Sequence, residues 1–125
     1  MSNISIEQVY ATFVERFGTE PWGWSCAPGR LEILGNHTDY NEGYVLSTAV
    51  NRATFAVFGP HTQSSLALLS RTLGDPVSHF ALSEVLEHHA SSHWSDYIKG
   101  VLVEAYKRGL PLKGFQMVVD SQIPL

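Results

Sequence analysis

Residues 27–50 read A-P-G-R-L-E-I-L-G-N-H-T-D-Y-N-E-G-Y-V-L-S-T-A-V, and this stretch decides how the rest of the chain is interpreted. A strand-like run at residues 31–34 precedes a polar, turn-forming stretch at residues 35–43, and apolar residues resume at Tyr44. Changes of this kind indicate an extended segment, a loop and a second extended segment. We therefore predict that two apolar runs support a loop at residues 35–43.

The predicted loop holds more polar side chains than a simple connection needs. A turn requires two or three turn-forming residues, whereas this loop, with Arg30 at its entry, brings together a guanidinium, an imidazole, a carboxylate and several amide or hydroxyl groups. Loops with such chemistry are typical of sites that recognise a charged or polyhydroxylated ligand. The candidate binding residues are Arg30, Asn36, His37, Thr38, Asp39 and Asn41.

The stretch P-G-R-L-E-I-L-G-N-H-T-D-Y-N-E-G-Y-V-L resembles the sugar-recognition signature of the galactokinases, in the superfamily of galactokinase, homoserine kinase, mevalonate kinase and phosphomevalonate kinase. In that family the pattern usually reads G-R-V-N-L-I-G-E-H-T-D-Y-N-x-G-x-V-L-P. Glu32 stands where the family usually has asparagine, and Asn36 stands where it usually has the glutamate that binds the sugar. The resemblance implies a kinase that transfers the γ-phosphate of ATP, with Mg²⁺, to the anomeric C1 hydroxyl of galactose or a related sugar.

The resemblance also implies roles for single side chains. Arg30 is the catalytic candidate, because a fixed cation stabilises the phosphoryl group during its transfer. Asp39 is expected to accept hydrogen bonds from two adjacent sugar hydroxyls. The implied sugar-binding set is Asn36, His37, Thr38 and Asp39. The departures at Glu32 and Asn36 leave the preferred sugar open.

Two aromatic residues, Trp94 and Tyr97, are weaker candidates for contacts with ATP. They lie three apart on a predicted helix, as in the W-x-x-Y helix that borders the adenine pocket of the family. Aromatic residues on a helix are more often part of a core. Core packing therefore stays open as the alternative.

Residue chemistry alone leaves other interpretations of the loop open. Arg30 could make structural bonds to the backbone, and Asp39 could simply form a turn. His37 and Asp39 have the H-x-D spacing of a metal-binding pair, but no third ligand is evident, and we predict no metal site. The alternatives to a kinase are thus a non-catalytic sugar-binding or regulatory relative and a metal-dependent binding module.

Composition narrows the class of protein. The chain has 125 residues, a formal net charge of −4 and 44% hydrophobic residues, which fits one soluble domain or a piece of one. The mild acidity argues against nucleic acid as a partner, and no apolar stretch approaches the length of a membrane span. The first residues lack a signal-like pattern, so we expect a cytoplasmic protein. Oligomeric state is left open.

Periodicity predicts the remaining elements. A helix capped by Asn3 or Ser5 carries an apolar stripe and ends at Gly18. Trp22 and Trp24 share one face of a strand, and we expect them to pack in a core or between domains rather than against a sugar. Cys26, the single cysteine, is expected to be buried. Further strands are predicted at 53–58, 66–70, 77–82 and 114–123, and helices at 83–90 and from residue 92 to Gly109.

These elements predict an α+β fold. We expect a mixed, mainly antiparallel sheet of about five strands with helices on one face, like the N-terminal domain of the superfamily. No phosphate-binding glycine motif is present, and the family's phosphate loop normally follows a strand that ends in I-P, as at Ile123-Pro124. We therefore expect residues 1–125 to be the N-terminal, sugar-recognition part of the kinase, truncated before the phosphate loop and without the C-terminal domain. This part is expected to be inactive alone. Most contacts to ATP and Mg²⁺ are expected elsewhere in the parent protein.

Overall fold

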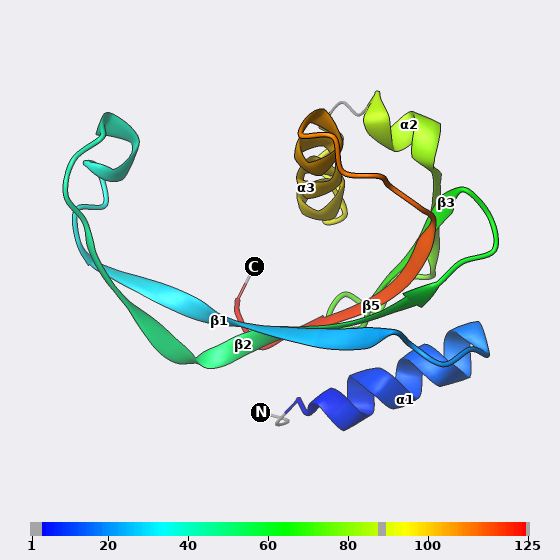
Figure 1. Cartoon of the computed structure of the whole chain (residues 1–125). Helices are drawn as coiled ribbons and strands as arrows, with labels where there is room; N and C mark the ends of the chain where they lie inside the picture. Colours follow the sequence, from blue (N-terminus) through cyan, green and yellow to red (C-terminus); the bar gives the residue numbers. More distant parts are fainter. Residues whose placement is uncertain (1–3, 88–89, 125) are drawn as a thin grey trace.

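A computed structural model describes residues 4–87 and 90–124 of the chain. Three α-helices, one short 3₁₀ helix and five strands lie within these ranges (Figure 1). In chain order the elements are α1 (Ile6–Phe17), β1 (Gly23–Leu34), η1 (Asp39–Asn41), β2 (Leu46–Pro60), β3 (Ser65–Ser70), β4 (Ser78–Ala81), α2 (Leu82–Leu86), α3 (Asp96–Lys107) and β5 (Phe115–Ser121).

The strands form one sheet in the order β1-β2-β5-β3-β4. Strands β3 and β5 pair in parallel, and the other neighbouring pairs are antiparallel. The predicted α+β fold with a mixed, mainly antiparallel sheet of five strands is confirmed. The parallel pair is possible because α2 and α3 lie between β3 and β5 in the chain and make the crossover connection.

The helices cover both faces of the sheet, so the prediction that they pack on one face is wrong (Figure 1). Alternation along β3 and β5 explains the difference, because successive side chains point to opposite faces of a strand. Leu69 and Val118 join Val9 and Phe13 of α1 in one core cluster. The second cluster, on the face under α2 and α3, contains Leu66, Leu68 and Val85, with Phe80, Leu82, Trp94, Ile98, Leu102, Phe115 and Met117 packed against it.

Helix α1 begins and ends as predicted. Ser5 is its N-cap, and the backbone N–H of Ser5 donates to Oε1 of Gln8 over 3.3 Å. Gly18 ends the helix in the left-handed region, with φ at 65°. Asn3, the other predicted cap, lies outside the described residues.

Strands β1 and β2 form a two-stranded ribbon that extends far beyond the rest of the sheet and curls toward the side of α3 (Figure 1). Pro28 and Gly29 kink β1 without ending it, because the register with β2 shifts between Pro28 and Arg30. Strand β2 begins at Leu46, well before the predicted start at residue 53. Within the described residues β5 pairs with β2 over Thr54–Pro60, so β1 and β2 pair with one another alone in the distal part of the ribbon.

The prediction that Cys26 is buried is wrong, and of the two alternatives for Trp22 and Trp24 the structure contradicts packing in a core, while packing between domains stays a prediction. Trp22 and Trp24 are 63% and 58% exposed, and Cys26 is exposed as well. The physical reason is the position of β1 at the edge of the sheet, while α1 packs mainly over β2 and β5. Packing of the two tryptophans in the core of this chain is therefore excluded.

The elements near the C-terminal half follow the predictions with shifted bounds. Helix α2 ends at Leu86, and the predicted extension to residue 90 includes residues 88–89, which lie outside the described ranges. Helix α3 begins at Asp96 rather than at residue 92. Over the residues that the structure describes, no helix is long and apolar enough to cross a membrane.

Candidate functional site

The candidate site is the loop at residues 35–43 together with Arg30. The loop lies at the far tip of the β1–β2 ribbon, away from both core clusters (Figure 1). Its middle folds into η1, Asp39–Asn41. Because neither core holds this loop, hydrogen bonds within the loop must fix its shape.

Thr38 makes most of those bonds. Its hydroxyl Oγ1 lies 3.0 Å from the carbonyl oxygen of Gly35 and 2.9 Å from that of Tyr44. Its backbone N–H donates to the Gly35 carbonyl over 3.0 Å. Its own carbonyl accepts from the N–H groups of Asn41 and Gly43, at 3.1 and 2.7 Å. One residue thus ties both ends of the loop together.

Gly35 and Gly43 leave the space that Thr38 occupies. Gly35 has a φ of 97°, and a Cβ there would lie 2.6 Å from the Tyr44 carbonyl oxygen and 2.9 Å from Oγ1 of Thr38. A Cβ on Gly43 would lie 2.6 Å from Cβ of Thr38. Glycine is therefore required at both positions if the loop is to close around Thr38.

His37 is oriented by its neighbours in the loop. Its Nδ1 lies 3.0 Å from the hydroxyl of Tyr40, and its carbonyl oxygen accepts a bond of 2.8 Å from Nδ2 of Asn41. Nε2 is then the ring nitrogen that can meet a ligand, and it is a donor when the Tyr40 hydroxyl donates to Nδ1. A donor on an exposed side chain suits a sugar oxygen.

Arg30 and Asp39 meet although they come from β1 and η1. Nη2 of Arg30 lies 3.8 Å from Oδ2 of Asp39, and the two side chains are 68% and 55% exposed. The structure therefore brings together the predicted catalytic cation and the predicted sugar-binding carboxylate. Both charges remain open to solvent and to a ligand.

Asn36 is exposed in the same loop, and Glu32 is half-buried on β1. Glu32 stands opposite Ser47 of β2 in the register of the ribbon, on the strand that precedes the loop. Asn36 thus belongs to the group of exposed polar residues at the tip.

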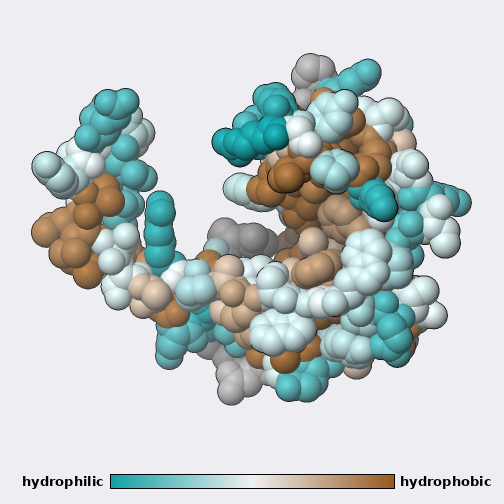
Figure 2. Space-filling view, in the orientation of Figure 1, coloured by the Kyte–Doolittle hydropathy of each residue, from teal (hydrophilic) through white to brown (hydrophobic). Residues whose placement is uncertain are grey.

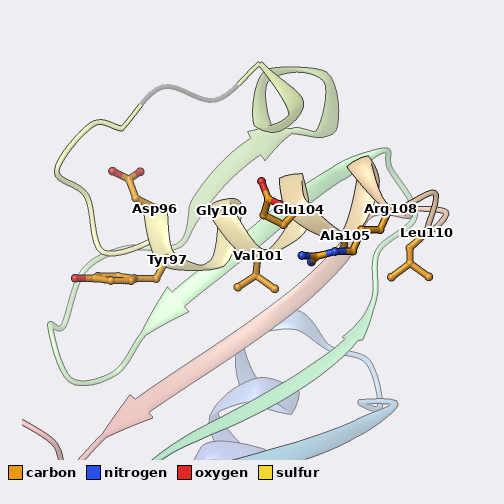
Figure 3. Close-up of a pocket in the computed structure, with 8 residues that line it drawn as sticks. All are labelled: Asp96, Tyr97, Gly100, Val101, Glu104, Ala105, Arg108 and Leu110. Atoms are coloured by element: carbon orange, nitrogen blue, oxygen red, sulfur yellow. The ribbon is translucent and has the colours of Figure 1, made fainter. Parts of the chain in front are cut away.

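Trp94 and Tyr97 lie far from this loop and differ from one another. Trp94 packs against the core cluster under α2 and α3, and its indole Nε1 is buried with no hydrogen-bond partner among the described residues. Tyr97 is 85% exposed. It lines a groove on α3 together with Val101, Leu110 and five neighbours (Figure 3). The structure therefore does not place the two aromatic rings in one pocket.

His37 and Asp39 are the pair with the spacing of metal ligands. Within residues 4–87 and 90–124, no group of three or more His, Cys, Asp or Glu side chains could hold a metal. His37 and Asp39 thus lack a third such ligand nearby among the described residues. These residues do not fit a Mg²⁺ site of their own.

Sequence reasoning missed two contributors to the loop. Tyr40 orients His37 through its hydroxyl, and the carbonyl of Tyr44 accepts from Thr38. The spacing of three residues between His37 and Tyr40 was a usable signal, because residues three apart meet in a helical turn. No side-chain pattern reveals the role of the Tyr44 carbonyl.

Comparisons with known proteins agree with the position of this loop. The family model described as "Galactokinase galactose-binding signature" matches residues 11–60, which include Arg30 and the whole loop. Galactokinases of Chloroflexus aurantiacus and Chloroflexus aggregans are each 34% identical to the chain over 119 residues. The chain is related to the galactokinases. It covers 30% of the length of each of these two curated relatives, and the matches span 95% of the chain itself.

The fold of the chain also matches solved structures of kinases. The galactokinase of Lactococcus lactis, solved in complex with galactose, superimposes with a TM-score of 0.80 and 31% identity, over 95% of this chain and 31% of that one. Mevalonate kinase of Methanococcus jannaschii superimposes with a TM-score of 0.67 and 16% identity, over 82% of this chain and 33% of that one. The second match shows that the fold of this galactokinase-related chain recurs in another kinase.

Proposed function

We propose that this chain is the sugar-recognition part of a larger galactokinase-like kinase. The parent protein would transfer the γ-phosphate of ATP to the C1 hydroxyl of galactose or a related sugar in the cytoplasm. The observation that carries the proposal is the ion pair of Arg30 and Asp39 beside the exposed side chains of Asn36 and His37. A loop with this chemistry in the galactose-binding signature is suited to a sugar and a transferred phosphoryl group.

Each side chain has a chemical task in this proposal. Asp39 accepts hydrogen bonds from two adjacent sugar hydroxyls, because a carboxylate offers only acceptors and a diol offers donors. His37 and Asn36 add donors and an acceptor that orient the sugar ring. Arg30 stabilises the negative charge that spreads over the phosphoryl oxygens during transfer. Trp94 and Tyr97 stay the candidates for ATP, and Mg²⁺ is assigned to the part of the parent protein outside residues 1–125.

The surface area of the chain supports the idea of a larger parent. The chain exposes 8556 Å². A compact monomer of 13.9 kDa is expected to expose about 6,700 Å², so the excess is about 1,900 Å². This excess exceeds the half of an ordinary protein interface that each partner contributes, about 800 Å². The remaining two thirds of a galactokinase-sized polypeptide would cover such an area.

The exposed apolar residues form two groups that the rest of the parent protein would cover. Figure 2 shows apolar side chains at the distal end of the ribbon and on the side of α3 that faces the ribbon across an open hollow. The distal group contains Leu31, Ile33, Leu34, Val45 and Leu46, and the group on α3 and after it contains Tyr97, Val101, Tyr106 and Leu110. We assign the hollow between them to the rest of the parent kinase rather than to a second copy of this chain.

The experiment that tests the function is a sugar-dependent assay of ADP release. The parent protein, purified with ATP and Mg²⁺, should release ADP only when galactose or a related sugar is added. Residues 1–125 alone should release none above background, because phosphoryl transfer needs several groups around the β- and γ-phosphates and Arg30 supplies one cation. Sugar-independent hydrolysis by the parent protein, or full activity of residues 1–125, would overturn the proposal.

A non-catalytic sugar-binding relative is the second candidate, and Asn36 is the observation that favours it. An amide at this position lacks the charge of the glutamate that the signature usually carries. In this case the parent protein binds sugar but releases no ADP in its presence. Equilibrium binding of the sugar, measured beside the ADP assay, distinguishes the two candidates.

A further inference from the structure

We propose that Thr38 is a positioning residue that holds the sugar-binding loop closed before any ligand arrives, rather than a ligand of the sugar. The sequence alone places Thr38 in the sugar-binding set because it lies between His37 and Asp39. The hydrogen bonds of its side chain and backbone point to a different task.

The first argument is the number of protons on the hydroxyl. A threonine hydroxyl carries a single donor proton. Oγ1 of Thr38 already lies within hydrogen-bond distance of two carbonyl oxygens, those of Gly35 and Tyr44. These oxygens are acceptors only, so the proton is either shared between them or given to one of them. Oγ1 can still accept a bond, but a sugar oxygen could receive its proton only after the loop had lost a bond.

The second argument is the placement of the bonded groups. Gly35 directly follows the end of β1, and Tyr44 lies two residues before the start of β2, so the two carbonyls lie at the two ends of the loop. Thr38 therefore links the residue after β1 to a residue just before β2 through hydrogen bonds. The two side chains next to it in sequence, those of His37 and Asp39, are exposed.

The third argument is the space reserved around Thr38. Both nearby glycines, Gly35 and Gly43, would place a Cβ closer than 3.0 Å to the side chain of Thr38. Contacts this close do not occur between real side chains. The backbone at Gly35 and Gly43 therefore lies too near Thr38 for any residue with a Cβ. This close approach of Gly35 and Gly43 fixes the place of Thr38 in the loop, although Thr38 itself remains exposed.

Exchange of backbone amide protons in the ligand-free chain tests the proposal. Thr38→Val keeps the branched shape and removes the hydroxyl. The N–H groups of Asp39 and Gly43 are bonded within the loop, and their exchange should become about threefold to tenfold faster, as expected for the loss of one hydrogen bond. Thr38→Ser should restore the rates of the original protein.

Two further variants keep the result interpretable. Thr48→Val removes a hydroxyl that donates to the neighbouring Ala49 carbonyl on the same ribbon, outside the loop, and loop exchange should stay within twofold. Gly43→Ala pushes against Cβ of Thr38 and should speed exchange of the same amides by a second route. Unchanged exchange in both Thr38→Val and Gly43→Ala would overturn the proposal.

The consequence for sugar affinity rests on the proposed function, whereas the exchange result does not. In the parent kinase, Thr38→Val should raise KM for the sugar and leave kcat within about threefold, because a loosened loop presents His37 and Asp39 less often in the bound arrangement. Thr38→Ser should recover KM. A rise in KM without faster amide exchange in the ligand-free chain would instead identify the hydroxyl as a direct sugar contact, and would contradict the proposal. A parent protein with no kinase activity at all would leave the exchange experiment unaffected.

Discussion

Arg30 of β1 and Asp39 of η1 form an ion pair at the tip of the ribbon, with Nη2 3.8 Å from Oδ2 and both side chains more than half exposed. Exposed pairs of this kind stabilise a fold by only about 0–1 kcal/mol. The pair is therefore a poor explanation for the stability of the loop. Its position suits an encounter with a ligand that carries hydroxyl groups and a phosphoryl group.

Replacement of Asp39 should separate recognition from folding. Asp39→Ala in the parent kinase removes the acceptor for two sugar hydroxyls and should lower kcat/KM by about 10²–10⁴-fold, since bonds to charged groups contribute about 1.5–3 kcal/mol each. The melting temperature should change little, because Asp39 is exposed. Asp75→Ala, at an exposed acid outside the loop, is the matched control and should leave the kinetics unchanged. Activity of Asp39→Ala within twofold of the original would show that Asp39 only forms a turn.

Replacement of Arg30 by lysine tests the role of the guanidinium. The substitution keeps the charge but loses the planar set of donors, so we expect kcat to fall by about tenfold or more while KM for the sugar changes less. Arg16→Lys, on the exposed side of α1, should have no effect on either parameter. Unchanged kcat in Arg30→Lys would make the arginine structural.

Asn36 is expected to tune the choice of sugar. A carboxylate makes a charge-assisted bond to a sugar hydroxyl that is stronger than the bond of an amide by about 1 kcal/mol. Asn36→Glu should therefore tighten galactose binding by about fivefold to tenfold. Profiles over hexoses, pentoses and deoxy sugars would show which hydroxyl is involved. A strong preference for galactose that survives Asn36→Ala would make the position irrelevant to recognition.

The exposed face of α3 should become covered in the parent kinase. Val101 is 69% exposed in this chain and lines the groove in Figure 3. In a Cys26→Ser background, a thiol introduced by Val101→Cys should react readily with a maleimide in residues 1–125 and at least tenfold more slowly in the parent protein. A thiol introduced by Glu15→Cys on the outer side of α1 should react equally in both proteins.

Two other labelling results would contradict the prediction that the rest of the parent kinase covers α3. Equal reaction of the Val101→Cys thiol in both proteins would show that the rest of the kinase does not reach α3. Protection that appears in residues 1–125 alone and grows with protein concentration would assign the surface to a second copy of the chain.

The sequence was sufficient where local patterns control the structure. Ser5, Gln8 and Gly18 predicted both ends of α1, because caps act within one turn of the helix. The polar residues at 35–43 predicted a loop, and the structure places this loop at the tip of the ribbon, while its binding role stays a prediction. These features depend on residues close together in the chain.

The sequence was insufficient where distant segments meet. Burial of Trp24 and Cys26 depends on whether a helix covers β1, and no pattern within β1 reveals that α1 packs mainly over β2 and β5. The partly buried bond of 2.7 Å from Arg71 to Asp120 joins residues that are 49 positions apart. The placement of helices on both faces was missed for the same reason, since alternation shows two apolar faces but not which helix takes each.

The product formed by the parent kinase from ATP and galactose tests the account most directly. Phosphorus NMR of the reaction mixture should show a sugar phosphate whose phosphorus couples to the anomeric proton, and the same signal should be reduced at least about a hundredfold in Asp39→Ala. This result would place phosphate on the C1 hydroxyl and sugar recognition in the loop described above. A phosphate on any other hydroxyl, or an equal yield from Asp39→Ala, would contradict the account.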